Sequence, residues 1–311
     1  MNVDSKPKLS VAEVLHLIYA LTRTISVACI TLLTGLFRGE SGHKVYFRHV
    51  AHATLRALNG VASIRELQAV QPSTVEAYTA FAKEQGFEPD IVNLLGSSGK
   101  LLWLGDSEAS NVLVCLHGGG FVFPARTQFQ LYWDLRKQSH NEEDYAIALL
   151  AYSLVPAARY PVQLTETIAL LRYLVEEKGK DPQKITISGD SAGALLALGA
   201  ISHILHPHPA VQPLKLSFPL AGIALISPWV TPRVNADCAK RNTLKDTLSK
   251  EIVDGWGALI IRVAQEDEYN TPLMATAEWW AGTDTVVKDT ILTAGRQEIL
   301  FDDIETFTGR F

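Results

Sequence analysis

Residues 185–197 of this chain read ITISGDSAGALLA, and this short stretch decides the fold. Its first residues are typical of a strand, and the small and apolar residues from Ala192 onward favour a helix. Between them, residues 189–193 form a G-x-S-x-G sequence centred on Ser191. A serine on a sharp strand-to-helix turn has a strained backbone and an exposed hydroxyl, and the flanking glycines relieve the steric crowding. The stretch therefore predicts a nucleophilic serine at the carboxyl end of a buried strand.

The alternation of strand and helix continues on both sides of this turn. Short, almost wholly apolar runs suit strands that are covered on both faces. A Gly-Ser-Ser-Gly sequence at 96–99 predicts a hairpin between 91–95 and 100–104. We therefore expect a doubly wound, mostly parallel α/β sheet. The further predicted strands are 111–116, 145–151, 184–188, 221–227 and 290–293, and the main helices follow Pro161 and span 192–205.

The chain has 311 residues, and its pattern divides into four parts. Residues 1–85 are predicted to be a helical cap or a membrane-associated segment, and 86–228 to be the α/β core. Residues 229–283 break the strand rhythm and predict an inserted, mostly helical cap. Residues 284–311 continue the core, which we expect to be incomplete and to lack its last strand. The insertion contains four tryptophans, Trp229, Trp256, Trp279 and Trp280.

The segment 11–37 leaves two interpretations open. It is mostly apolar, but His16 and Arg23 interrupt it, and the uninterrupted part is 14 residues long. A helix needs about 20 apolar residues to span a bilayer. The segment is either a buried or lid-forming helix pair or a site of peripheral membrane contact. Since no secretory signal stands out, we expect an intracellular protein, cytoplasmic or membrane-associated.

Composition excludes several classes of function. The formal net charge is -5, and no cluster of basic residues marks a nucleic-acid surface. Cys29, Cys115 and Cys238 are far apart and lack metal-ligand spacing, which favours a reducing compartment. We expect neither a metal nor a cofactor.

A second motif, His117-Gly118-Gly119-Gly120-Phe121, follows the predicted strand 111–116. Glycines let backbone N–H groups approach a substrate oxygen with no Cβ in the way. A flexible turn is the alternative for a lone triple glycine. Together with the amide of Ala192, the three glycines are the candidate oxyanion hole. We expect His117 to shape the loop and not to act as a base, because it precedes the nucleophile.

These two motifs resemble those of the hormone-sensitive-lipase-like esterases, a branch of the α/β-hydrolases. The resemblance implies an α/β-hydrolase fold and a serine nucleophile acting on carboxylic esters. It also implies that Gly119, Gly120 and Ala192 are the main oxyanion donors. Fungal members of the family suggest the tailoring of a secondary metabolite, by analogy.

The acid of a catalytic triad should follow the predicted strand 290–293. Glu298 stands two residues before Leu300, where the resembling family has an aspartate. A glutamate can orient a histidine equally well. Asp302 and Asp303 are fallbacks, but we expect them to cap the helix that begins there.

No histidine follows Glu298, and all nine histidines precede it. Those at 203, 206 and 208 lie at the far end of the predicted helix 192–205, about 18 Å or more from Ser191 at 1.5 Å per residue. We expect them to be surface residues. The sequence therefore predicts a truncated form of an ester hydrolase whose small-molecule substrate is unspecified. A ligand-binding, receptor-like protein and an inactive remnant are the alternatives.

Overall fold

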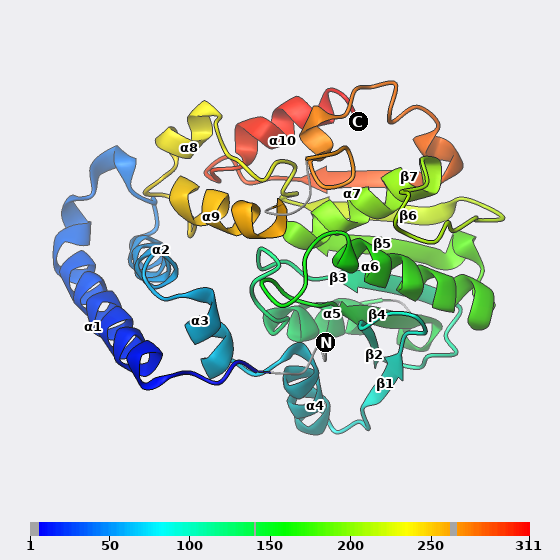
Figure 1. Ribbon diagram of the computed structural model, residues 1–311, viewed down its shortest axis with the longest axis horizontal. Coiled ribbons are helices and arrows are strands. Elements are labelled where there is room, and N and C mark those ends of the chain that lie inside the picture. Colours follow the sequence, from blue (N-terminus) through cyan, green and yellow to red (C-terminus); the bar gives the residue numbers. More distant parts are fainter. Residues whose placement is uncertain (1–5, 140, 262–265) are drawn as a thin grey trace.

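The computed structural model describes residues 6–139, 141–261 and 266–311, which form a seven-stranded sheet flanked by helices (Figure 1). The strands lie in the order β1-β2-β4-β3-β5-β6-β7. β1 and β2, and β2 and β4, pair antiparallel, whereas the other neighbours are parallel. This arrangement confirms the predicted doubly wound sheet. The strands β1 to β7 are Asp90–Asn93, Lys100–Leu104, Asn111–Leu116, Tyr145–Ala151, Ile185–Asp190, Leu220–Ile226 and Val287–Thr293.

Helices cover both faces of the sheet because successive strand residues point to opposite faces. α4 (Thr74–Gln85) and α5 (Thr127–Lys137) share a core with one face. α6 (Val162–Arg172), α7 (Ala192–Leu205) and α10 (Phe301–Thr308) share the larger core of the other. A π-helical turn, Tyr173–Glu177, extends α6. The short 3₁₀ turns are Gly35–Phe37, Gly39–Ser41, Glu142–Asp144, Pro182–Lys184, Pro272–Met274 and Thr283–Thr285.

The predicted core elements agree closely with the structure. β3, β4 and α7 have the predicted bounds, and the predicted hairpin joins β1 and β2 through the pair Asn93 and Lys100. β7 begins at Val287, three residues earlier than predicted. Its first residues pair with the start of β6, although Lys288 and Asp289 interrupt the apolar pattern that the prediction followed.

The insertion is less helical than predicted. It contains α8 (Asp237–Arg241) and α9 (Lys250–Ile261), and turns make up most of its other described residues. The predicted insertion also includes 262–265, which lie outside the described residues. α8 and α9 lie between the sheet and the N-terminal helices (Figure 1).

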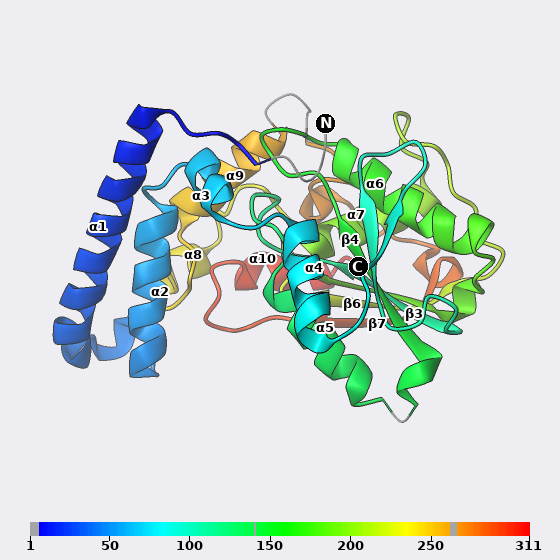
Figure 2. The ribbon, with the colours of Figure 1, turned by 90° about the horizontal axis from the view of Figure 1, so that it is seen from below.

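The N-terminal residues 11–85 form α1 (Val11–Thr34), α2 (Tyr46–Asn59), α3 (Ile64–Val70) and α4. α1 and α2 pack side by side at one end of the molecule, away from the sheet (Figures 1 and 2). Capping boxes fix the first turns of α1, α3 and α4, because a serine and a glutamate satisfy each other's backbone amides there. The serines are Ser10, Ser63 and Ser73.

α1 differs from the prediction in length and in exposure. The helix continues through both polar interruptions, and the Nδ1 of His16 lies 2.8 Å from the Glu66 carboxylate. Val11–Phe37 is consequently long and apolar enough, by length and composition, to cross a membrane. α1 is not a buried helix, since only Leu17, Ala20 and Thr24 are buried along it.

Candidate functional site

Ser191 occupies the turn between β5 and α7. Its backbone has φ 52° and ψ −112°, which is unusual for a residue with a side chain. Two hydrogen bonds hold this strained turn: the Ser191 amide donates to the Ile226 carbonyl (2.9 Å), and the Trp229 amide donates to the Ser191 carbonyl (3.1 Å). The residue is half-buried and lines a pocket. This is the geometry that the G-x-S-x-G sequence predicts.

The two glycines of the motif are required by close backbone packing. A Cβ on Gly193 would lie 1.8 Å from the Leu116 carbonyl oxygen at the end of β3. A Cβ on Gly189 would lie 2.4 Å from the Gly193 carbonyl oxygen. Both distances are far below van der Waals contact, so the first turn of α7 can rest against β3 only when these side chains are absent.

The triple glycine lies next to this turn, but its three amides are not equivalent. The Gly118 amide donates to Asp190 Oδ1 at 2.8 Å, so a carboxylate occupies it. Among the described residues, the amides of Gly119, Gly120 and Ala192 have no hydrogen-bond acceptor. Gly120 and Ser191 line the same pocket. Three of the described backbone amides, near Ser191 in the chain or in the glycine loop, are therefore without an acceptor, whereas the Gly118 amide ties the loop to the end of β5.

His117, at the start of this loop, is held in place by Tyr152. The side chain is fully buried, and its ring stacks on Tyr152 with a centroid distance of 4.0 Å. The Tyr152 hydroxyl donates to the His117 carbonyl at 2.7 Å. Burial lowers the pKa of His117 to about 4, so the imidazole is neutral at physiological pH. This environment agrees with a structural role.

Glu298 lies in the turn after β7, at the same sheet edge as Ser191. The Ser227 hydroxyl donates to Glu298 Oε1 at 2.8 Å, and the Gly295 amide donates to the same oxygen at 2.9 Å. The other oxygen, Oε2, is buried and has no partner among the described residues. Burial raises the pKa of this carboxyl group. One oxygen is thus anchored and the other is open to a further donor.

Two residues of the insertion, which the sequence analysis missed, hold the Glu298 turn in place. Asn242 is buried, and its amide donates to the carbonyls of Arg296 (3.1 Å) and Glu298 (2.9 Å). Asp246 Oδ2 accepts from the Ile299 amide at 2.7 Å. No sequence pattern marked either residue, because the contacts join segments more than fifty residues apart.

The prediction that Asp302 and Asp303 cap the last helix is wrong. Leu300 is the N-cap of α10, and no side chain caps this helix. Asp302 instead accepts from the Cys238 amide and pairs with Arg241 at 2.7 Å. Asp303 is buried, and its Oδ2 has no partner among the described residues. Burial raises the pKa of Asp303 to about 6.

The prediction of surface histidines at the end of α7 is also partly wrong. His203 and His208 are buried, and the His208 amide donates to His203 Nδ1 at 3.0 Å. The loop after α7 folds back over the helix end, where the Gln212 carbonyl lies 3.2 Å from His203 Nε2. No described histidine lines the pocket that contains Ser191, and His140 lies outside the described residues.

The pocket at Ser191 is small and apolar. It has room for about one water molecule. Val253 and Trp256 of α9, and Leu300 directly before α10, contribute apolar side chains to its wall. Its lining consists of Gly120, Ser191, Trp229, Leu248, Val253, Trp256 and Leu300.

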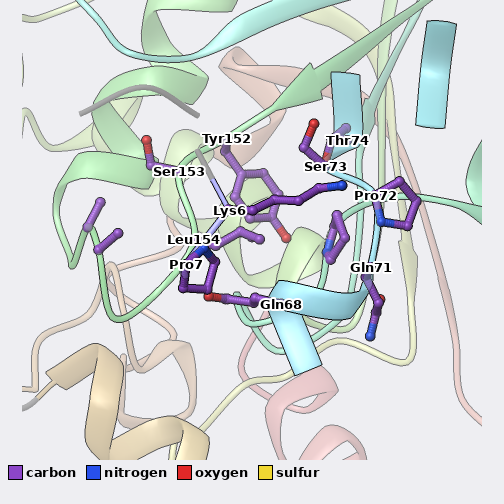
Figure 3. A pocket seen from close by; sticks show the side chains of 13 residues that line it. Lys6, Pro7, Gln68, Gln71, Pro72, Ser73, Thr74, Tyr152, Ser153 and Leu154 are labelled. Carbon is purple, nitrogen blue, oxygen red and sulfur yellow. The ribbon is translucent and has the colours of Figure 1, made fainter. Parts of the chain in front are cut away.

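A separate hollow lies near the N-terminal end of the chain (Figure 3). It is lined by residues from 6–7, 68–74 and 152–158, and by Pro124, and it includes neither Ser191 nor Glu298. Gln68 at its wall donates to the carbonyls of Val122 and Val155, both at 2.8 Å. Gln68 therefore holds the loop that follows the glycines in place. In the part of the chain that the structure describes, no three His, Cys, Asp or Glu side chains are grouped to hold a metal ion.

Comparisons with known proteins agree with this fold. The chain is 27% identical over 125 residues to arylacetamide deacetylase of Rattus norvegicus, covering 34% of this chain and 31% of that protein. It is 32% identical over 100 residues to acetyl esterase of Salmonella schwarzengrund, covering 31% and 30%. The chain thus matches about a third of the length of each of these relatives.

The structure of an esterase from the bacterial hormone-sensitive lipase family superimposes with a TM-score of 0.59, at 22% identity, covering 79% of this chain and 80% of that one. A family described as the alpha/beta hydrolase fold matches residues 113–311, and the chain belongs to this family.

Proposed function

We propose that this protein is a serine hydrolase of carboxylic esters, of the hormone-sensitive-lipase type. The observation that carries the proposal is the strained, half-buried Ser191, which shares a pocket with Gly120 of the glycine loop. The amides of Gly119, Gly120 and Ala192, which have no acceptor among the described residues, support it as the proposed oxyanion donors. Esterases bearing this fold and the names of the similar curated proteins support it.

In the proposed reaction, Ser191 Oγ attacks the carbonyl carbon of the ester and its proton passes to a base. The three open amides then stabilise the negative oxygen of the tetrahedral intermediate, and removal of one such donor typically costs about 3 kcal/mol. The intermediate collapses to an acyl-serine as the base returns the proton to the leaving alcohol. Water then attacks the acyl-serine by the same route.

Glu298 is the proposed acid of the triad. Ser227 and Gly295 fix one of its oxygens, and the buried, unpartnered Oε2 is suited to accept the Nδ1–H of an imidazole. Since no described histidine lines the serine pocket, we propose that this imidazole comes from outside the described residues. Without it the serine hydroxyl stays protonated and weakly nucleophilic.

The proposed substrate carries a small acyl group. The names acetyl esterase and arylacetamide deacetylase both denote removal of an acyl group, and the pocket beside Ser191 has little free volume. A role in tailoring a secondary metabolite stays a prediction from the sequence resemblance.

The direct test is covalent labelling of the full chain with a fluorophosphonate, in which Ser191 Oγ displaces fluoride from phosphorus. We expect mass spectrometry to find the adduct on Ser191, and Ser191→Ala to abolish it. Added imidazole should accelerate p-nitrophenyl acetate hydrolysis by the parent protein more than by Ser191→Ala, since free imidazole can act as the base that Ser191 requires. A folded protein that shows neither effect would favour ligand binding without catalysis.

A matched pair of variants tests the acid. Glu298→Gln should slow labelling in the presence of imidazole at least about 100-fold, as loss of a triad member does. Asp303→Asn alters a second buried carboxyl group but should leave the labelling rate within a factor of about two. The opposite result would assign the acid to Asp303.

We also propose that α1 rests on a lipid surface. Apolar side chains repeat along one stripe of the helix and are exposed, among them Leu15, Ile18, Ile25 and Leu33. Residues 1–60 contain seven Lys or Arg and three Asp or Glu, whereas the whole chain has a net charge of -5. An apolar helix in a basic segment suits the interface of an anionic membrane.

A further inference from the structure

A crevice of about 600 Å³ separates the N-terminal helices from the insertion. On one side, α1 contributes Arg23 and Val27, and the segment 56–64 contributes the end of α2 and the start of α3. On the other side, the wall consists of residues between Ser249 and Trp256, around α9. These elements lie at the end of the molecule where α1 and α2 stand away from the sheet (Figures 1 and 2). The crevice is thus far larger than the pocket at the serine.

Trp256 is the wall that the crevice and the serine pocket share. It lines both of them and is itself buried. A Cβ on Gly120 would lie 2.3 Å from Trp256 Cε3, so the indole rests directly on the backbone of the glycine loop. Phe123 packs edge-on against the same ring at a centroid distance of 5.5 Å. Movement of one side chain would join the two spaces.

The lining of the crevice has a distinct chemistry. Val27, Val61, Ile64, Ile252 and Trp256 supply apolar surface. Two guanidinium groups, of Arg23 and Arg56, also line it, and among the described residues neither forms an ion pair with a carboxylate. The acidic residue of the lining is Glu251, so the lining carries a net positive charge.

Arg56 is the better placed of the two cations. It is half-buried, and one of its N–H groups donates to the Asp246 carbonyl. A guanidinium has five donors in a planar fork, which matches a carboxylate. Burial lowers the pKa of Arg56 from its ordinary value, but the group remains charged at neutral pH. A partly desolvated cation with unused donors favours an anionic ligand.

We propose that the crevice binds the apolar body of an ester whose far end carries a carboxylate, with Arg56 and Arg23 holding that carboxylate and Trp256 dividing the body from Ser191. This inference rests on the proposed hydrolase function, since it assigns the bound molecule as the substrate of Ser191. It specifies the substrate as an amphipathic anion and names Trp256 as a residue that limits access to the serine.

The test measures binding on the full-length Ser191→Ala protein, where no chemistry can occur. The ligands are octanoate, 1-octanol and octyltrimethylammonium, which share a chain and differ in charge. We expect octanoate to bind at least about tenfold more tightly than octanol, the effect of one charge-assisted hydrogen bond. Octyltrimethylammonium should bind more weakly than either. Equal affinities for the three ligands would overturn the proposal.

Variants locate the site. Arg23→Met with Arg56→Met should abolish the preference for octanoate and leave octanol affinity within a factor of about two, whereas Arg56→Lys should retain most of the preference. Arg126→Met removes an exposed arginine outside the crevice and is the matched control. A loss of preference in that control, or its retention in the double variant, would contradict the assignment.

Trp256 provides the second measurement. Octanoate should change the tryptophan fluorescence of the parent protein, and Trp256→Phe should remove most of that change; a change that persists places the ligand elsewhere. The outcomes separate the two proposals. Octanoate binding without fluorophosphonate labelling would support the crevice alone, and labelling without selective binding would support the hydrolase alone.

Discussion

The elbow at Ser191 and the N-terminal helix pair α1–α2 are built on opposite principles. At the elbow, backbone packs on backbone so closely that a Cβ on Gly193 would lie 1.8 Å from a carbonyl oxygen. The helix pair, by contrast, exposes much of its apolar surface, and few polar contacts tie it to the insertion. Among the described residues, these contacts are the bonds of His52 to the Lys245 carbonyl and of Arg56 to the Asp246 carbonyl.

The difference indicates that the Ser191 turn is tightly packed, whereas the helix pair α1–α2 is loosely attached to the rest of the molecule. Tight backbone packing holds Ser191 in its strained conformation, which the proposed hydrolase function requires before any substrate arrives. The helix pair borders the crevice, so the proposed ligand would contact the part of the molecule that has few polar ties among the described residues. Positions that bind or admit ligands are generally drawn from the less stable parts of a fold.

The largest effect on stability is expected for Gly193→Ala. The added methyl group meets the Leu116 carbonyl, so either α7 or β3 must move. We expect a loss of more than about 4 kcal/mol in the free energy of unfolding, which places the change among the exceptional destabilisations. Urea titration followed by circular dichroism measures it. A matched change at Gly255, which has no atom within 4 Å of an added Cβ, should be neutral or stabilising.

A smaller effect is expected where the insertion holds the Glu298 turn. Asn242→Ala leaves two carbonyls without their donor in a buried site, which should cost about 2–3 kcal/mol. The same variant should slow imidazole-assisted labelling of Ser191, because the turn that carries the acid is no longer fixed. A loss of stability with an unchanged labelling rate would show that the insertion supports the fold without positioning the acid.

Asp303 provides a test of a buried carboxyl group in α10, outside both of these regions. Its pKa of about 6 lies above its ordinary value, so between about pH 4 and 6 the folded state binds a proton that the unfolded state releases. Stability should therefore fall as pH rises through this window. Asp303→Asn should remove this fall and add about 2 kcal/mol at pH 8 but little at pH 4. Urea titrations at both pH values measure the difference, and Asp302→Asn, at an exposed ion pair, should not reproduce the gain.

The smallest effect on stability is expected at the helix pair itself. Replacement of Leu15, Ile18 and Ile25 by serine removes exposed side chains and should change the free energy of unfolding by less than about 0.5 kcal/mol per site. The same triple variant should reduce flotation with vesicles of phosphatidylcholine and phosphatidylserine. Equal flotation of parent and variant would contradict the proposed lipid contact, and a large loss of stability would show that α1 is packed against another surface.

The sequence by itself determined the elements that depend on local chemistry. The strand and helix on either side of Ser191, and the succession of strands and helices along the chain, follow from apolar periodicity and from the turn that the G-x-S-x-G sequence marks. These patterns extend over a few residues, so they can be recognised in a single sequence.

Only the tertiary structure decided which atoms are available for chemistry. In the structure, the Gly118 amide donates to Asp190, and His203 and His208 are buried. Glu298 Oε2 has no partner among the described residues, and Trp256 packs on Gly120. Each of these contacts joins residues that are distant in the chain or depends on how a loop folds back. The physical reason is that burial and hydrogen-bond pairing are set by the whole packed chain, and no local pattern records them.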